Sequence, residues 1–224
     1  FEDAARRTAQ IAYDLAFPGV PAFYSWPSQD KLSPAAYLRD ASNAEWTVPH
    51  LRHFLEQLAE RSGADAIHLI AHSMGNRALT RALEGIAAAM GEQDGPRFRE
   101  VVLTAPDVDA GVFRQLAAVM RRAAGRVTLY ASSKDRALQA SHKLNGFPRA
   151  GDAGEDLVVL PDVETVDASL VDTDLVGHFY YGDNRSVLSD VYYLLREGKP
   201  PGERFGLHER QVADGPYWVF RPGG

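Results

Sequence analysis

Ser73, in "IAHSMGNRAL" (residues 70–79), is the side chain best placed for nucleophilic chemistry. It lies between a short apolar run and a segment with helical spacing, with the small residues Ala71 and Gly75 two positions to either side. This spacing is typical of a strand that turns at once into a helix, because bulky side chains there would collide. Such a turn would aim helix N–H groups at a nearby oxyanion. Ser73 could instead only cap the helix, but its position between strand and helix favours a nucleophile.

A serine hydroxyl is a weak nucleophile unless a base removes its proton, and histidine is the usual base. Three of the seven histidines follow Ser73, namely His142, His178 and His208. His142 falls in a helical stretch and His208 in the C-terminal tail. His178, in "DLVGHFYY", follows the fourth predicted strand and is expected on a loop. We therefore predict that His178 is the base.

A carboxylate between Ser73 and His178 is needed to orient the imidazole. Asp135, in "TLYASSKDRAL", follows the third predicted strand, and Asp107 and Asp109, in "LTAPDVDAGVF", follow the second. Both places suit the acid, and we favour Asp135. Asp135 and Asp109 could also serve as N-caps of the helices that follow them.

The elements that must position these residues alternate along the chain. Continuous apolar runs predict strands at 66–71, 100–105, 126–132 and 156–161, the last of which could continue through 164–168. Periodic segments predict helices at 1–16, 47–61, 76–90, 112–124, 136–144 and 185–196. Residues 20–26 form a β-prone run, and residues 29–46 read as a polar loop. This alternation predicts a mostly parallel sheet with helices on both faces, whose sites form where strands end.

Composition limits the possible classes of protein. The chain has 224 residues, 45% of them hydrophobic and 24% charged, and a net charge of −6. The negative charge argues against nucleic acid or an anionic membrane surface as a partner. Without cysteine there is no disulfide, thiolate metal site or cysteine nucleophile. No run of roughly 18 apolar residues predicts a transmembrane segment. The compartment and the oligomeric state stay open, since the chain begins with Phe1 and a targeting segment could precede it.

Four segments in this order carry a family resemblance: "YSWPS", "IHLIAHSMGNRAL", "SSKDRAL" and "GHFYY". With them the chain resembles the α/β-hydrolase superfamily, and more closely a bacterial branch of esterase/lipase-like proteins catalogued as a domain of unknown function. The similarity covers about residues 1–200. It implies an α/β-hydrolase-like three-layer sandwich, a catalytic triad of Ser73, Asp135 and His178, and no cofactor.

The chain departs from this family at its beginning. The resemblance implies a strand ending in His-Gly before the first helix, whose loop gives the oxyanion hole an N–H group beside that of Met74. We expect an N-terminal truncation, with this strand missing from beside the 66–71 strand. In the alternative, "VPAFYS" (20–25) is that strand and "SWPS" is the oxyanion loop.

The domain prediction is a single α/β-hydrolase-like domain over residues 1–198. Residues 199–224, rich in Gly and Pro, are expected to form an irregular tail. Phe205, Trp218 and Phe220 are expected to pack this tail onto the domain.

These observations lead us to expect a serine hydrolase that cleaves a small-molecule carboxylic ester through an acyl-enzyme intermediate. Trp26, Tyr37 and Trp46, expected on loops, could line an acyl pocket or simply pack the loops. The same triad would also suit an acyltransferase, and an inactive hydrolase fold used for protein contacts is a third reading. No metal site is expected, because the "DVDAG" loop (107–111) lacks the ligand pattern of a calcium loop.

Overall fold

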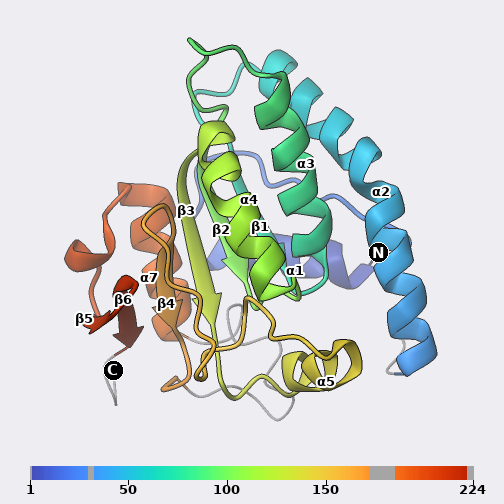
Figure 1. The fold of residues 1–224 in the computed structure, drawn as a ribbon. Coiled ribbons are helices and arrows are strands. Elements are labelled where there is room, and N and C mark those ends of the chain that lie inside the picture. Colours follow the sequence, from blue (N-terminus) through green and yellow to red (C-terminus); the bar gives the residue numbers. More distant parts are fainter. Residues whose placement is uncertain (1, 30–32, 172–184, 221–224) are drawn as a thin grey trace.

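A six-stranded sheet forms the centre of the protein. The computed structural model describes residues 2–29, 33–171 and 185–220. The strand order is β1-β2-β3-β4-β6-β5, parallel throughout except for β5, which is antiparallel to β6 (Figure 1). The strands are β1 (His68–His72), β2 (Phe98–Thr104), β3 (Ala124–Ala131), β4 (Glu164–Asp167), β5 (Leu207–Val212) and β6 (Gly215–Phe220).

Helices cover both faces of this sheet. They are α1 (Glu2–Asp14), α2 (Pro34–Arg61), α3 (Gly75–Ala89), α4 (Ala110–Ala123), α5 (Arg136–Asn145) and α7 (Arg185–Glu197), with the short 3₁₀ helix η1 (Pro201–Glu203). The helices α2, α3 and α4 pack on one face, α1 and α7 on the other, and α5 lies beyond the carboxyl ends of the strands (Figure 1). The predicted three-layer α/β sandwich is confirmed.

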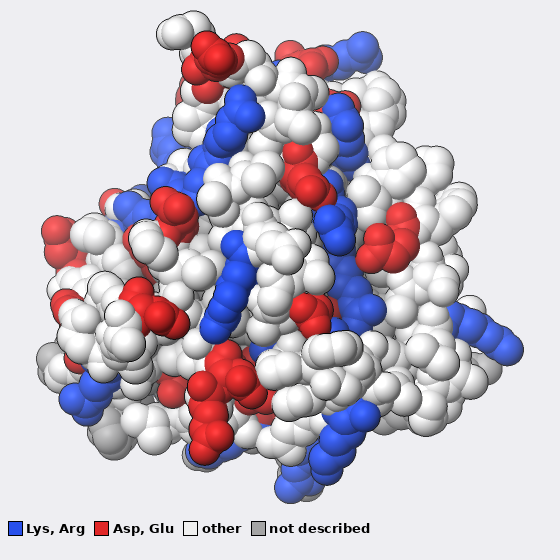
Figure 2. All heavy atoms as spheres, in the orientation of Figure 1, with Lys and Arg blue, Asp and Glu red and all other residues white. Residues whose placement is uncertain are grey.

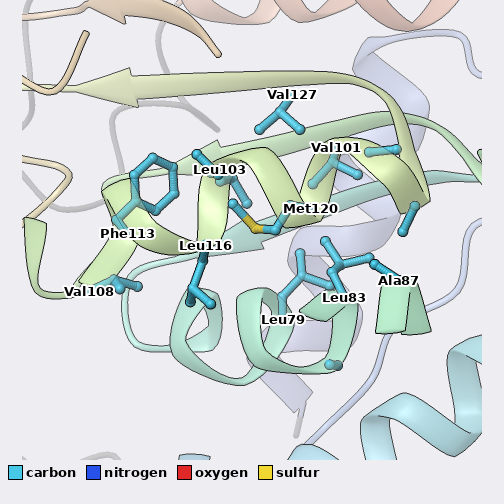
Figure 3. Packing of buried hydrophobic residues seen from close by; sticks show 14 of the residues in the cluster. Leu79, Leu83, Ala87, Val101, Leu103, Val108, Phe113, Leu116, Met120 and Val127 are labelled. Carbon is cyan, nitrogen blue, oxygen red and sulfur yellow. The ribbon is translucent and has the colours of Figure 1, made fainter. Parts of the chain in front are cut away.

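The strands β2 and β3 are buried from both sides, which explains why their sequences are continuous rather than alternating, whereas β1 lies at the edge of the described sheet and leaves Ile70 37% exposed. In β2, Val101 and Leu103 face α3 and α4, whereas Val102 faces α1 and α7. Figure 3 shows Phe113 and Met120 of α4 packed against the first of these faces. The alternating direction of side chains along a strand thus divides the core into two layers.

The helix α2 begins at Pro34, well before the predicted start at residue 47. Ser33 is its N-cap and accepts a hydrogen bond from the N–H of Ala36 at 3.2 Å, with Pro34 in the first turn. Only Ala36, Asp40 and Ala44 are buried in the part of α2 before residue 47. The apolar periodicity of this part is therefore weak, and it did not predict a helix. Tyr37 and Trp46 therefore lie on a helix, and the prediction that they lie on loops is wrong.

The predicted irregular tail is also wrong. Residues 207–220 form the hairpin β5–β6, and β6 pairs in parallel with β4, so a boundary at residue 198 would divide one sheet. The segment "QVADGPYW" (211–218) carries the signal for this hairpin, a turn ending in Asp-Gly between β-prone runs. Phe220 is buried and Trp218 is partly buried, as expected. Phe205 is 70% exposed, so the expectation that it packs onto the domain is wrong.

Residues 17–29 form neither helix nor strand, and within the described residues β1 pairs only with β2. The alternative in which "VPAFYS" pairs beside β1 is therefore wrong. Pro21 lies within "VPAFYS" and Pro18 lies two residues before it, and neither has an N–H group for a ladder. Tyr24 of this segment turns toward α2, where the hydroxyl lies 2.8 Å from Thr47 Oγ1. The fourth strand, predicted at 156–161, lies instead within the extension considered, at 164–167.

A buried ionic cluster joins α7 and Arg204, the residue that follows η1, to the sheet. The Arg204 guanidinium, whose side chain is fully buried, lies 3.2 Å from Glu164 Oε2 and 3.4 Å from Asp190 Oδ1. Tyr130 donates to Asp190 Oδ2 at 2.5 Å, and Arg126 lies 3.3 Å from Glu164 Oε1. Buried charges are stable only when paired, so this cluster holds the segment just before the hairpin against β4 and α7.

Glu100 is the weakly paired member of this cluster. Its side chain is 5% exposed, and its nearest cation is Arg126 Nε at 3.7 Å. Burial raises the pKa of Glu100 from 4.5 to about 7, although Arg126 opposes the shift. The folded state therefore holds this proton more tightly than the unfolded chain does.

We predict that Glu100 makes the protein less stable as the pH rises from 4.5 to about 7. In this window the folded state retains a proton that the unfolded state loses, so each pH unit costs at most about 1.4 kcal/mol. Glu100→Gln should remove this cost. In urea titrations its stability gain over the wild type should be larger at pH 8 than at pH 5. The exposed change Glu92→Gln is the control, and an equal gain at both pH values would refute the prediction.

Candidate active site

Ser73 stands at a strained turn between β1 and α3. Its backbone φ is +52°, in the left-handed region that non-glycine residues seldom adopt. Its N–H donates to the carbonyl of Thr104 at 3.0 Å, which continues the β1–β2 ladder by one residue. The predicted sharp turn from strand to helix is therefore present.

The helix-capping alternative for Ser73 is not realised. The N-cap position of α3 is occupied by Met74, with no side-chain capping bond. Within the described part of the chain, the Ser73 hydroxyl has no hydrogen-bond partner, and the Met74 N–H group donates no hydrogen bond. The hydroxyl of a partly exposed serine thus lies next in sequence to an unpaired backbone donor at the start of a helix.

The side chain of Asn76 holds this turn in place by two hydrogen bonds. The sequence analysis did not identify this residue. Its fully buried side chain donates from Nδ2 to the carbonyl of Ser73 at 2.9 Å and to that of Thr104 at 3.2 Å. One amide therefore ties the Ser73 peptide to the end of β2. The signal was present in "HSMGNR", where a polar residue stands on the face of α3 that the periodicity assigns to the core.

Asp135 follows β3 and is completely buried. It is the N-cap of α5, and its Oδ1 accepts from the N–H of Leu138 at 3.0 Å. Asp109 caps α4 in the same way, accepting from Val112 N at 2.9 Å. The capping roles considered for both residues are present, and a carboxylate retains further acceptor capacity beyond one such bond.

Asp107 is surrounded differently. Ser141 donates to its Oδ1 at 2.6 Å, and Tyr37 donates to its Oδ2 at 2.9 Å. Arg77 Nη2 lies 3.2 Å from the same Oδ2 and also contacts the Tyr37 hydroxyl. Burial and the negative charge of Asp107 raise the pKa of the Tyr37 phenol, so this hydroxyl keeps its proton and stays a donor. Both oxygens of Asp107 are thus engaged by three helices.

The prediction for His178 falls outside the described residues. Of the other two histidines considered, His142 lies on α5 with Nδ1 3.8 Å from Asp152, and His208 is exposed on β5. Neither position gives a reason to replace His178 as the predicted base.

The three aromatic residues predicted to line an acyl pocket have different surroundings. Trp46 is 62% exposed, and its ring lies 4.6 Å from that of His50. Tyr37 directs its hydroxyl to Asp107, and Trp26 is partly buried in the segment before α2. The acyl-pocket role of these residues stays a prediction.

Two further features bear on partners. In the parts of the chain that the structure covers, no three His, Asp or Glu side chains gather as metal ligands, and no helix combines the length and hydropathy of a membrane span. On the face shown in Figure 2, acidic and basic side chains are interspersed.

Comparison with known proteins agrees with this geometry. Residues 1–191 match a family described as "Alpha/beta hydrolase of unknown function (DUF900)". Neither curated proteins nor solved structures gave a match. The matched region spans β1 to β4 and includes the Ser73 turn, Asp107 and Asp135. The protein therefore belongs to this family of alpha/beta hydrolases of unknown function.

Proposed function

We propose that the protein is a serine hydrolase that cleaves carboxylic esters through an acyl-enzyme intermediate. The observation that carries the proposal is the Ser73 turn, where a partly exposed, left-handed serine stands next in sequence to the unpaired N–H group of Met74. Strain of this kind costs of order 1–3 kcal/mol and persists where the surrounding structure enforces it, often at active sites. Membership of a hydrolase family supports the same chemistry.

In the proposed mechanism, Ser73 Oγ attacks the ester carbonyl while His178 takes the hydroxyl proton. The carbonyl oxygen becomes an oxyanion that accepts from the Met74 N–H and from a second donor. The tetrahedral intermediate expels the alcohol, which receives the proton from His178. Water then attacks the acyl-enzyme by the same route and frees Ser73.

Asp135 is the proposed acid that orients His178. Asp135 follows β3 and Ser73 follows β1. Because these strands are parallel, both residues lie at the edge of the sheet formed by the carboxyl ends of the strands. Asp107 has both carboxylate oxygens bonded to Ser141 and Tyr37, which favours Asp135 over Asp107. Asp135 also follows the later of the two strands, which favours it over Asp109. The buried carboxylate of Asp135 is also kept in place by the first turn of α5.

Ser73→Ala should abolish labelling by a fluorophosphonate probe and lower ester hydrolysis by a factor of at least about 10³, because the nucleophile is lost. Mass spectrometry of the labelled peptide and hydrolysis of p-nitrophenyl esters measure the two effects. The exposed variant Ser42→Ala is the matched control. Labelling of Ser73→Ala at the wild-type rate would refute the assignment, and product analysis with added alcohols separates hydrolysis from acyl transfer.

The strain at Ser73 can be measured separately from activity. Glycine adopts positive φ without steric cost, whereas alanine has a Cβ there as serine does. Ser73→Gly should therefore be more stable than Ser73→Ala by about 1 kcal/mol. Chemical denaturation of the two variants measures the difference. If Ser73→Ala is equally or more stable, the backbone at this turn is not strained.

Asp135→Asn separates the two roles of this residue, because asparagine is as good an N-cap as aspartate but carries no charge. The melting temperature should stay close to that of the wild type, while kcat should fall by about 10⁴, as when a triad loses the acid that sets the histidine tautomer. Asp109→Asn, the same change at the cap of α4, should leave kcat unchanged. Full activity in Asp135→Asn would exclude it as the triad acid.

A further inference from the structure

Asp107 makes contacts with every element that bears a proposed catalytic residue in the described part of the chain. It lies three residues beyond the end of β2, and its side chain is 3% exposed. Its partners come from α2, α3 and α5, through Tyr37, Arg77 and Ser141.

The main chain of Asp107 is bonded directly to the Ser73 turn. Its N–H donates to the carbonyl of Ser73 at 3.2 Å. Its own carbonyl accepts from Arg77 Nε at 2.6 Å, and Arg77 belongs to the first turn of α3. With Asn76 Nδ2 on the same Ser73 carbonyl, the peptide that sets the direction of the Ser73 side chain is held from two sides.

The side chain of Asp107 holds the helix that begins after Asp135. Ser141, buried within α5, donates to Asp107 Oδ1 at 2.6 Å. Asn145, at the end of α5, donates from Nδ2 to the Tyr37 hydroxyl at 2.9 Å, which in turn donates to Asp107 Oδ2. Because Asp135 caps the continuous helix that contains Ser141, a bond that holds Ser141 also restrains the position of Asp135.

The charge on Asp107 makes this arrangement strong. Two guanidinium groups face it, with Arg77 Nη2 at 3.2 Å and the nearly buried Arg149 Nε at 3.9 Å. Hydrogen bonds to an ionised acceptor are shorter and stronger than bonds between neutral groups. A neutral side chain of the same shape would keep contacts but lose this attraction and leave two cations unmatched.

We infer that Asp107 is a positioning residue, which fixes the distance between Ser73 and Asp135 by bonding the turn through its backbone and α5 through its carboxylate. This inference rests on the proposed function. It assigns to Asp107 a role different from that of the triad acid, for which the sequence made it one of three candidates. Arg77 supports this positioning role, because it donates hydrogen bonds to both the carbonyl and the carboxylate of Asp107.

The decisive variant is Asp107→Asn, which keeps the size of the side chain and removes its charge. A misplacement of about 1 Å in a catalytic group can cost about 10²-fold in rate. We expect kcat and the rate of fluorophosphonate labelling to fall by about 10- to 100-fold, with KM within about twofold of the wild type. Ser141→Ala, which removes one bond to Asp107, should lower the same rates by a few-fold only.

The pH dependence of labelling distinguishes positioning from the role of triad acid. A carboxylate beside the base raises the pKa of that base, so replacing the triad acid by asparagine moves the midpoint of the labelling profile to lower pH. Asp135→Asn should show this movement, whereas Asp107→Asn and Ser141→Ala should keep the wild-type midpoint. Asp109→Asn, in the same loop, is the control for rate and midpoint. Circular dichroism restricts the comparison to folded protein.

Three results would overturn the inference, and they have different meanings. If folded Asp107→Asn and Ser141→Ala both label at the wild-type rate, Asp107 serves only stability. If Asp107→Asn moves the midpoint and Asp135→Asn does not, Asp107 is the triad acid. If the wild type is labelled no faster than Ser73→Ala, the proposed function fails, and the inference fails with it. Should Asp107→Asn not fold, Ser141→Ala alone decides between the first result and the expected one.

Discussion

The left-handed backbone of Ser73 is the constraint on which the site depends. A serine with φ of +52° is less stable than one in a helix or strand, so other bonds must hold it. The N–H of Ser73 continues the ladder to Thr104, and its carbonyl accepts from Asn76 and from the N–H of Asp107. All of these partners stand at the carboxyl end of β2 or in the first turn of α3. The turn is therefore a product of the parallel β1–β2 pairing, which brings these groups to one edge of the sheet.

The two faces of the sheet are held to their helices by different interactions. On the side of α3 and α4, apolar side chains from both helices fill the space against β2 and β3, and this packing fixes α3 relative to the strand that precedes it. On the side of α1 and α7, the sheet contacts both an apolar layer and the ionic cluster around Arg204 and Asp190. This cluster holds the segment before the β5–β6 hairpin against α7. The ionic cluster fixes the position of this segment, because its charges must stay paired. The apolar layer supplies most of the favourable free energy of packing.

Two aspartates that follow neighbouring strands illustrate how surroundings assign roles. Asp107 and Asp135 stand at comparable places, beyond β2 and β3, and both are buried. Asp107 is bonded on both carboxylate oxygens to side chains of three helices and faces two arginines, so its charge holds the structure together. Asp135 caps the helix that Asp107 holds through Ser141. A carboxylate bonded on both oxygens to three helices is suited to hold those helices in place.

Local patterns in the sequence were enough to predict the turn at Ser73, the positions of β1 to β3 and the layered sheet, and they offered the caps at Asp109 and Asp135 as alternatives. Each depends on residues close together in the chain, through steric limits, capping or apolar periodicity. The long extension of α2, the β5–β6 hairpin as part of the sheet, and the partners of Asp107 were decided by the tertiary structure alone. Tyr37, Asp107 and Ser141 are separated by 70 and 34 positions, and no local pattern says that they meet. Their contact depends on how three helices pack around the ends of the strands, which is set by the whole core and by no single segment.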